Sequence, residues 1–187
     1  MKIYACCFIG HRKIKMTDEM KEKLKNFIEY LIVELKVSVF LFGSVSQFDD
    51  LCHEIVTNLK EKYPHIERVV YPCRSEGYTL ETEKAQRERV FSNFFKTEVK
   101  ILGVERAVYF KNVYTAGKAS YIERNYAMID DSDYCVFFYD EDYQVKVDVF
   151  SNNVLSSKSG TKIAYDYAVK KKKKIFNIFK ILNDKNW

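Results

Sequence analysis

Residues 154–174 read Val-Leu-Ser-Ser-Lys-Ser-Gly-Thr-Lys-Ile-Ala-Tyr-Asp-Tyr-Ala-Val-Lys-Lys-Lys-Lys-Lys, and the run Ile-Phe-Asn-Ile-Phe that follows at 175–179 has the composition of a strand. A Ser/Lys/Gly loop ends in Gly160-Thr161, and a stretch with helical spacing follows, whose apolar face is Ile163, Ala164, Tyr167 and Ala168. Small residues at the start of a helix let a ligand approach the backbone, and the free N–H groups there favour an anion.

The same alternation of strands and helices extends over the rest of the chain. Strands are predicted at 2–9, 37–42, 67–71, 134–139 and 175–179, with weaker candidates at 106–110 and 145–150. Helices are predicted at 18–35, 48–62, 118–129 and after Gly160, with a polar candidate at 76–93. Thr17 is expected to cap the first helix. Helices between strands imply right-handed crossovers and a parallel sheet covered on both faces.

The pattern therefore predicts an α/β fold, a single Rossmann-like three-layer domain with a mostly parallel sheet. The domain is expected to cover residues 1–180, with a variable insert at about 74–115. Residues 181–187 are expected to form a C-terminal tail, either mobile or acting as a lid. No internal repeat or linker divides the chain.

Composition narrows the class of protein. The 187 residues are 47% hydrophobic and 16% aromatic, enough for one sizeable core. No apolar run approaches the roughly 20 residues that span a bilayer, and the N-terminal apolar stretch is too short for a secretory signal, so we expect a cytoplasmic protein without membrane attachment. The five cysteines share no metal spacing and are expected to be structural, and no metal site is predicted.

The net charge of +5 is concentrated in Lys170 to Lys174. This run is expected to end a helix and lead into a strand, where cations complement the helix dipole. Nucleic-acid binding through the run is the less favoured alternative, because matching basic and aromatic stripes are absent elsewhere in the sequence.

Four segments have residues suited to a ligand at the sheet edge, where doubly wound folds bind their ligands. The first is Gly10-His11-Arg12, with a solvated loop as the alternative. The second is 43–49, in which Gly43, Ser44 and Gln47 are candidates and Asp49 either caps a helix or contacts the ligand. The fourth is 157–161, with Ser159, Gly160 and Thr161. None of the four is a P-loop or a GxGxxG fingerprint.

The third segment is Tyr121-Ile122-Glu123-Arg124-Asn125, in which Arg124 and Asn125 lie early in the helix before the strand at 134–139. On spacing alone they are expected on a solvated helix face. The nearby acidic group of Asp130, Asp131 and Asp133 is expected to serve turns and caps rather than a metal ion.

Several motifs together resemble the YpsA-like proteins of the SLOG superfamily, which includes DprA and the Lonely Guy phosphoribohydrolases. They are Cys-Cys-Phe-Ile-Gly-His-Arg at 6–12, Phe-Gly-Ser-Val-Ser-Gln-Phe-Asp at 42–49, Glu-Arg-Asn at 123–125 with Met-Ile-Asp-Asp-Ser-Asp at 128–133, and Ser-Gly-Thr at 159–161 with Tyr165 and Ala168. The resemblance covers most of the chain except roughly 74–115. It implies a Rossmann-like fold and a nucleotide-type ligand, with no other cofactor required, and it strengthens Arg124 and Asn125 as ligand residues.

Three departures from the family pattern bear on function. Ser46 and Ser159 stand where glycines are expected, and Ala164 stands where the Lonely Guy enzymes have the glutamate that helps to cleave the N-glycosidic bond. Without that carboxylate, acid/base chemistry at this position is lost. The departures therefore favour binding over hydrolysis, and no catalytic residue is assigned.

The expected function is that of a sensor or sequestering module for a nucleotide or an ADP-ribose-like molecule. The alternatives are a nucleoside-phosphate hydrolase that uses Glu123, Asp49 or Glu81 as its acid, and a DNA-associated protein similar to DprA. Self-association into a homo-oligomer is also expected, because SLOG relatives commonly self-associate and the segment 91–116 is rich in apolar residues.

Overall fold

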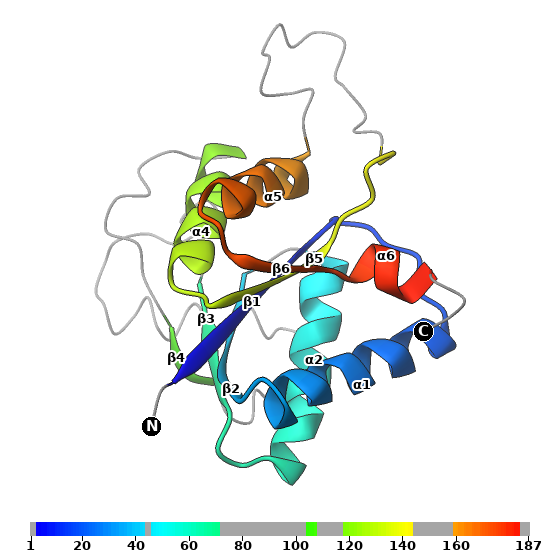
Figure 1. Cartoon of the computed structure of the whole chain (residues 1–187), viewed down its shortest axis with the longest axis vertical. Coiled ribbons are helices and arrows are strands. Elements are labelled where there is room, and N and C mark those ends of the chain that lie inside the picture. Colours follow the sequence, from blue (N-terminus) through cyan, green and yellow to red (C-terminus); the bar gives the residue numbers. More distant parts are fainter. Residues whose placement is uncertain (1–2, 44–45, 72–103, 108–117, 144–158, 184–187) are drawn as a thin grey trace, which may run out of the picture.

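The computed structural model describes residues 3–43, 46–71, 104–107, 118–143 and 159–183. In chain order the elements are β1 (Tyr4–Gly10), α1 (Asp18–Val33), β2 (Val37–Phe42), α2 (Gln47–Lys62), β3 (Glu67–Val70), β4 (Val104–Ala107), α4 (Lys118–Asp130), β5 (Tyr134–Phe138), α5 (Gly160–Lys170), β6 (Lys174–Asn177) and α6 (Ile178–Asn183). The alternation predicted from the sequence is confirmed for these segments (Figure 1).

The strands form one sheet in the order β4-β3-β2-β1-β5-β6, and every neighbouring pair is parallel. From β1 the chain moves outward through β2, β3 and β4, and it then returns to the other side of β1 as β5. The strand order therefore reverses between β1 and β5. In doubly wound sheets, ligands bind beyond the carboxyl ends of the strands at such a switch point.

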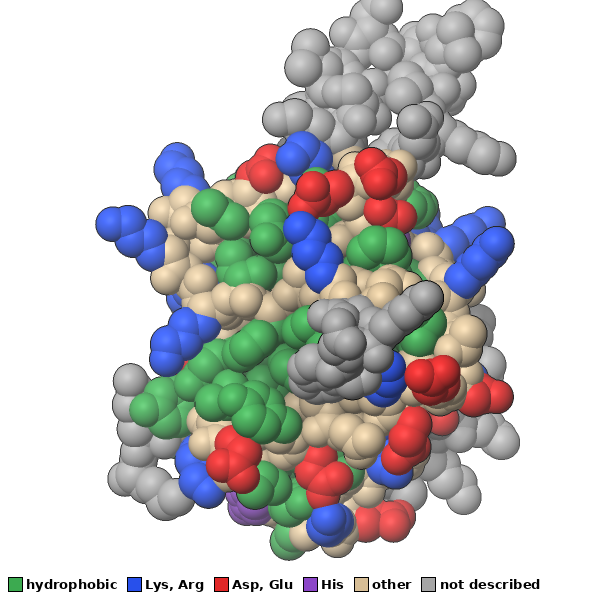
Figure 2. Space-filling model, turned by 45° about the vertical axis from the view of Figure 1, so that its right-hand side comes forward, with side chains coloured by type: hydrophobic (Ala, Val, Ile, Leu, Met, Phe, Trp, Pro, Cys, Tyr) green, Lys and Arg blue, Asp and Glu red, His purple; other side chains and the backbone are tan. Residues whose placement is uncertain are grey.

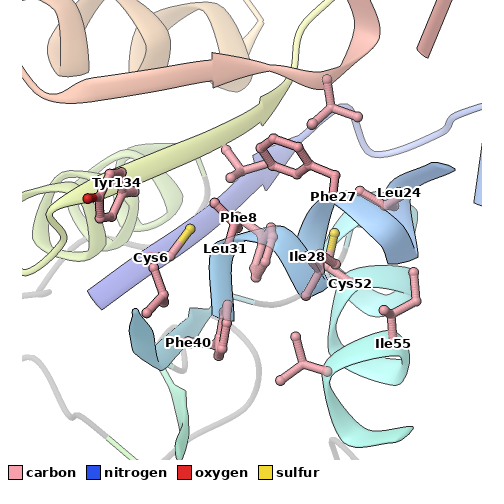
Figure 3. Packing of buried hydrophobic residues seen from close by; sticks show 14 of the residues in the cluster. Cys6, Phe8, Leu24, Phe27, Ile28, Leu31, Phe40, Cys52, Ile55 and Tyr134 are labelled. Carbon is pink, nitrogen blue, oxygen red and sulfur yellow. The ribbon is translucent and has the colours of Figure 1, made fainter. Parts of the chain in front are cut away.

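Two helical layers cover the sheet, as the three-layer prediction requires. One core cluster joins α1, α2 and α6 to one face, and it includes the aromatic side chains of Phe8, Phe27 and Phe40 (Figure 3). Phe8 is stacked on Phe42, with 5.5 Å between ring centroids. The second cluster joins α4 and α5 to the other face, and there the small residues Ala164 and Ala168 of α5 lie against the strands. The α/β, Rossmann-like prediction is confirmed.

Two predictions about helix ends, at the start of α1 and at the end of α5, can be compared with the structure. The Thr17 hydroxyl accepts from the Met20 N–H at 3.2 Å, which confirms Thr17 as the N-cap of α1. The lysine run ends α5 at Lys170, turns through Lys172 at a φ of 55°, and begins β6 at Lys174. The predicted position of this run between a helix and a strand is also confirmed.

The end of the chain differs in part from the prediction. The strand expected at 175–179 stops at Asn177, and residues 178–183 form α6, which includes the first three residues of the expected tail at 181–187. Residues 184–187 lie outside the described residues. Ile178 and Leu182 are buried in the cluster with α1, and the Phe179 ring packs on the edge of Phe138 with 5.4 Å between centroids. These apolar contacts hold α6 on the domain.

Several predictions fall wholly or partly outside the described residues. They are the helix at 76–93, the strand at 145–150, most of the insert at 74–115 and most of the apolar segment 91–116. The expected strand at 106–110 overlaps β4 at its first two residues. Self-association therefore stays a prediction.

The surface mixes charged and apolar side chains. Figure 2 shows apolar side chains gathered on one part of the visible face, with acidic and basic groups around them. The exposed large apolar residues among those described are Ile3, Tyr30, Val33, Tyr143 and Val169. Within the part of the chain described, no helix combines the length and the apolar composition needed to cross a bilayer.

Candidate functional site

His11 joins the two strands at the switch point. It follows β1 directly, and its Nε2 accepts a hydrogen bond of 3.1 Å from the Asp140 N–H, just beyond β5. The imidazole is stacked on Tyr143, with 3.8 Å between centroids, and is tilted toward Tyr139 at 6.1 Å. The side chain is only 2% exposed. Burial lowers the pKa of His11, although a hydrogen bond to the Asp140 backbone and the negative charge of Asp140 raise it in part.

The loop after β1 is also bound to the loop after β2. Ser46, the N-cap of α2, donates from its hydroxyl to the His11 carbonyl at 3.1 Å. The Gln47 N–H donates to the Arg12 carbonyl at 3.1 Å, and the Gln47 side-chain oxygen accepts from the Ile14 N–H at 3.0 Å. Gln47 thus holds the two loops together through its polar groups. Ser46, one of the departures from the family pattern, has a clear structural role here.

The glycines of these loops make room for side chains of the protein. A Cβ on Gly10 would lie 2.5 Å from a ring atom of Phe48, so residue 10 must lack a side chain for Phe48 to pack against β1. A Cβ on Gly43 would lie 2.7 Å from Cζ of Arg124. Gly43 therefore lets the guanidinium from α4 reach the end of β2.

Asp49 organises the second loop. Its carboxylate accepts from the Gly43 N–H at 3.1 Å, and its side chain is buried. The N-cap of α2 is Ser46, which accepts from the Asp49 N–H at 3.5 Å, so the capping alternative for Asp49 is wrong. The carboxylate instead stabilises the turn between β2 and α2.

Arg124 and Asn125 are buried rather than solvated, at 6% and 8% exposure, so the expectation based on spacing is wrong for both. The Asn125 side-chain oxygen accepts from Nε and Nη2 of Arg124, each at 3.2 Å. This contact orients the guanidinium toward Gly43. Glu123, next to them on α4, is exposed.

Two arginines meet at one aromatic ring. The Arg124 guanidinium lies 5.4 Å from the centroid of Tyr121, and that of Arg12 lies 5.8 Å from the same centroid. Arg124 is buried, whereas Arg12 is exposed. Both distances are within the range of cation–π attraction. Tyr121 therefore brings positive charge from the β1–α1 loop and from α4 to one place.

The N-terminus of α5 completes the group of loops. The Ser159 hydroxyl accepts from the Lys162 N–H at 3.0 Å. A Cβ on Gly160 would meet nothing within 4 Å, so the space beside this residue is open, while Thr161 is buried. Gly160 and Thr161 are the first residues of α5, so their backbone N–H groups have no acceptor within the helix itself.

Tyr139 connects His11 to α5. Its ring lies 4.8 Å from that of Tyr165, and its hydroxyl accepts from Nζ of Lys162 at 3.5 Å. This hydrogen bond, together with the charge of Asp166, raises the pKa of Lys162. Lys162 therefore adds a cation near the switch point, although it also pairs with Asp166 at 3.4 Å.

The acidic group at the end of α4 has structural partners. Asp133 accepts from the Ala5 N–H at 3.0 Å, and Asp131 accepts from the Tyr71 hydroxyl at 2.8 Å. Asp130 accepts from the Tyr167 hydroxyl at 2.9 Å and pairs with Lys171 at 2.9 Å. These contacts are structural, but they link the end of α4 to β1, to Tyr71 and to α5 and are not the turn and cap contacts that were predicted.

The structure thus connects most of the predicted site residues through direct contacts. The linked set contains Gly10, His11, Arg12, Gly43, Gln47, Asp49, Arg124 and Asn125, and Ser159, Gly160 and Thr161 lie at the helix that packs on Tyr139. Ser44 lies outside the described residues. Sequence reasoning included Tyr121 in the third segment without assigning it a role, and it missed Tyr139. The available signal was position, because Tyr121 lies one helical turn before Arg124 and Tyr139 directly follows β5.

Comparison with known proteins agrees with this arrangement. No curated protein matches the chain. A family model described as the YspA SLOG family matches residues 7–173, from β1 to the turn before β6. The match includes every loop of the candidate site, and the chain belongs to the YspA SLOG family.

Proposed function

We propose that this protein binds a nucleotide or a nucleotide-derived, ADP-ribose-like molecule at the carboxyl edge of its sheet, and that it acts as a sensor or sequestering module. The observation that carries the proposal is the meeting of Arg12 and Arg124 at Tyr121, beside the β1–α1 and β2–α2 loops. Guanidinium groups bind phosphate through paired hydrogen bonds. Membership of the SLOG family is consistent with a nucleotide-related function.

The charge arrangement favours an anion at this edge. Two guanidinium groups near one ring repel each other, and a phosphate held by both would offset that repulsion. The N-terminus of α5, with its open space beside Gly160, adds backbone donors and the positive end of a helix dipole. These features support a phosphate-bearing ligand. Nucleotides are the phosphate-bearing ligands that doubly wound folds typically bind.

Binding is proposed in preference to hydrolysis. Ala164, at the position of the hydrolase glutamate, is 1% exposed and belongs to the core cluster under α5. Of the other acids considered, Asp49 holds the Gly43 N–H, Glu123 is exposed on α4, and Glu81 lies outside the described residues. We therefore expect no adenine release when AMP is incubated with the protein and followed by chromatography. Adenine release at catalytic turnover would instead support the hydrolase alternative.

DNA binding through the lysine run is disfavoured by the contacts of its members. Lys171 pairs with Asp130, and Nζ of Lys173 donates to the carbonyls of Asp130 and Ser132 at 2.9 and 2.7 Å. These lysines stabilise the turn between α5 and β6.

A thermal-shift screen tests the proposal, with AMP, ADP-ribose, NAD and cyclic AMP as probes. A ligand at a hundred times its dissociation constant stabilises a fold by about 2.7 kcal/mol. At least one probe should raise the unfolding midpoint of the wild type and of Lys170→Ala, a charge control at the far end of α5. If no probe shifts the midpoint of folded protein, the proposal is rejected.

A further inference from the structure

Tyr143 is an aromatic side chain that the contacts of the candidate site leave partly uncovered. Its ring lies nearly parallel to the imidazole of His11, with 3.8 Å between the centroids and 14° between the planes. His11 is buried beneath the ring, whereas Tyr143 is 38% exposed. One side of the stack is therefore occupied by the protein, and the tyrosine keeps ring surface on which another flat group can lie.

The turn that carries Tyr143 is held in place by hydrogen bonds. The Tyr143 N–H donates to the Asp140 carbonyl at 3.3 Å, and the Asp142 N–H donates to the Asp140 carboxylate at 2.9 Å. Before the turn, the Asn177 side chain of β6 donates to the Tyr139 carbonyl at 2.8 Å and accepts from the Tyr139 N–H at 3.2 Å. The ring is thus held in a defined position, which reduces the entropy that a ligand must lose on binding to it.

Tyr143 also lies on the side of the sheet where we propose that a phosphate binds. Its partner His11 is tilted toward Tyr139, which belongs to the core cluster between the sheet and the helices α4 and α5. Of the two arginines, Arg124 is part of α4 and Arg12 directly follows His11. A base on Tyr143 and a phosphate at the arginines can therefore belong to one molecule.

The other exposed large apolar side chains among the described residues lie elsewhere. Ile3 precedes β1, Tyr30 and Val33 are in the last turn of α1, and Val169 is in the last turn of α5. Helices that connect parallel strands run opposite to them, so these four residues lie toward the amino edge of the sheet. Within this group, Tyr143 is the member at the carboxyl edge, where doubly wound folds bind their ligands.

We propose that Tyr143 stacks on the base of the bound nucleotide, while Arg12 and Arg124 hold its phosphate. This inference rests on the proposed function and adds the position of the base to it. Every base has a π face, so the contact adds affinity for a nucleobase without selecting one base over another. Stacking of a base on an aromatic side chain corresponds to roughly fivefold to hundredfold in affinity.

Titrations followed by NMR, with AMP and with ribose 5-phosphate as the probe that lacks a base, test the stacking. Tyr143→Leu removes the ring but keeps an apolar side chain beside His11. It should weaken AMP binding at least fivefold and leave ribose 5-phosphate binding unchanged, whereas Tyr143→Phe should bind AMP like the wild type. Tyr30→Ala, which removes an exposed tyrosine from α1, is the control and should bind both probes normally.

A nuclear Overhauser effect between the ring protons of Tyr143 and H2 or H8 of bound AMP should report the contact directly, and its absence at saturation would overturn the stacking. ADP-ribose, which carries the same base, replaces AMP if it binds more tightly. If the wild type binds the nucleotide and Tyr143→Leu binds it equally well, the stacking is wrong while the proposed function survives. The same holds if Tyr143→Leu loses affinity for ribose 5-phosphate to the same extent. If the wild type binds neither AMP nor ADP-ribose, the proposed function and the stacking both fail.

Discussion

The guanidinium of Arg124 occupies the space that a side chain on residue 43 would need, since a Cβ on Gly43 would lie 2.7 Å from Cζ of Arg124 and 2.9 Å from its Nε. Contacts this short force either the backbone or the guanidinium to move. The pair connects α4 with the end of β2, two elements that are far apart in the sequence.

Gly43→Ala should therefore displace Arg124 and weaken nucleotide binding at least tenfold. Overpacking of this kind costs about 1–3 kcal/mol of folding stability, so the variant should still be folded at 25 °C. Calorimetric titration with the best probe, next to urea unfolding, measures both effects. Wild-type affinity in a folded Gly43→Ala protein would show that Arg124 does not contact the ligand.

Gly160→Ala should not cause overpacking, because a Cβ at residue 160 has open space around it. Alanine in the first turn of α5 should leave stability unchanged or raise it by about 0.4–1 kcal/mol. If a phosphate binds against the backbone at this position, the added methyl group should still reduce affinity severalfold. Unaltered affinity would place the phosphate away from the N-terminus of α5.

Arg12→Ala tests the exposed member of the arginine pair. A charge-assisted contact with phosphate contributes about 1.5–3 kcal/mol, so affinity should fall at least tenfold. The unfolding midpoint should hardly change, because the side chain is exposed and its contact with Tyr121 is an exposed cation–π interaction. Lys170→Ala, which also removes one positive charge, is the control and should bind normally. A large loss of stability with unchanged affinity would mark Arg12 as structural.

The lowered pKa of His53 predicts how the free energy of unfolding depends on pH. Burial against Phe42, and to a lesser extent the charge of Arg68, lower the pKa of His53 to about 4. An unfolded histidine binds a proton below about pH 6.5, so the unfolded state gains protons first as the pH falls. Stability should be complete above pH 6.5 and should decrease between pH 6.5 and about pH 4, by about 3 kcal/mol from this residue.

The variant His53→Phe tests this prediction by urea unfolding at pH 8 and pH 5. Nε2 of His53 is buried and has no hydrogen-bond partner among the described residues, so an apolar ring of similar shape should stabilise the fold at both pH values and more strongly at pH 5. Part of the pH dependence should persist, because burial also lowers the pKa of His11. An unchanged difference between the two pH values would contradict the assignment to His53.

The sequence was most informative where local pattern decides structure. The buried parallel strand Val37–Phe42 is apolar except for Ser38, and α1 has an apolar face at helical spacing, so both could be predicted. The helix α6 could not, because its six residues continue an apolar run and are too few to show a helical period. The loops of the site were predicted from their small and basic residues.

The contacts within the site depend on the tertiary structure and could not be predicted. His11 and Asp140 are 129 positions apart, and only the parallel pairing of β1 with β5 brings them together. Arg124 follows Glu123 on a helix whose local pattern is polar, so its spacing suggested solvent exposure. Its burial results from the missing side chain at Gly43 and from the partner oxygen of Asn125.

The most direct test of the central claim is to map the amide chemical shifts of the ¹⁵N-labelled protein during titration with AMP and ADP-ribose. A nucleotide bound at the carboxyl edge should shift the amides of residues 10–12, Gly43, Asp140 and residues 159–161, while those of Lys170 to Lys174 stay in place. Shifts confined to the lysine run, or no shifts at millimolar ligand, would contradict the account.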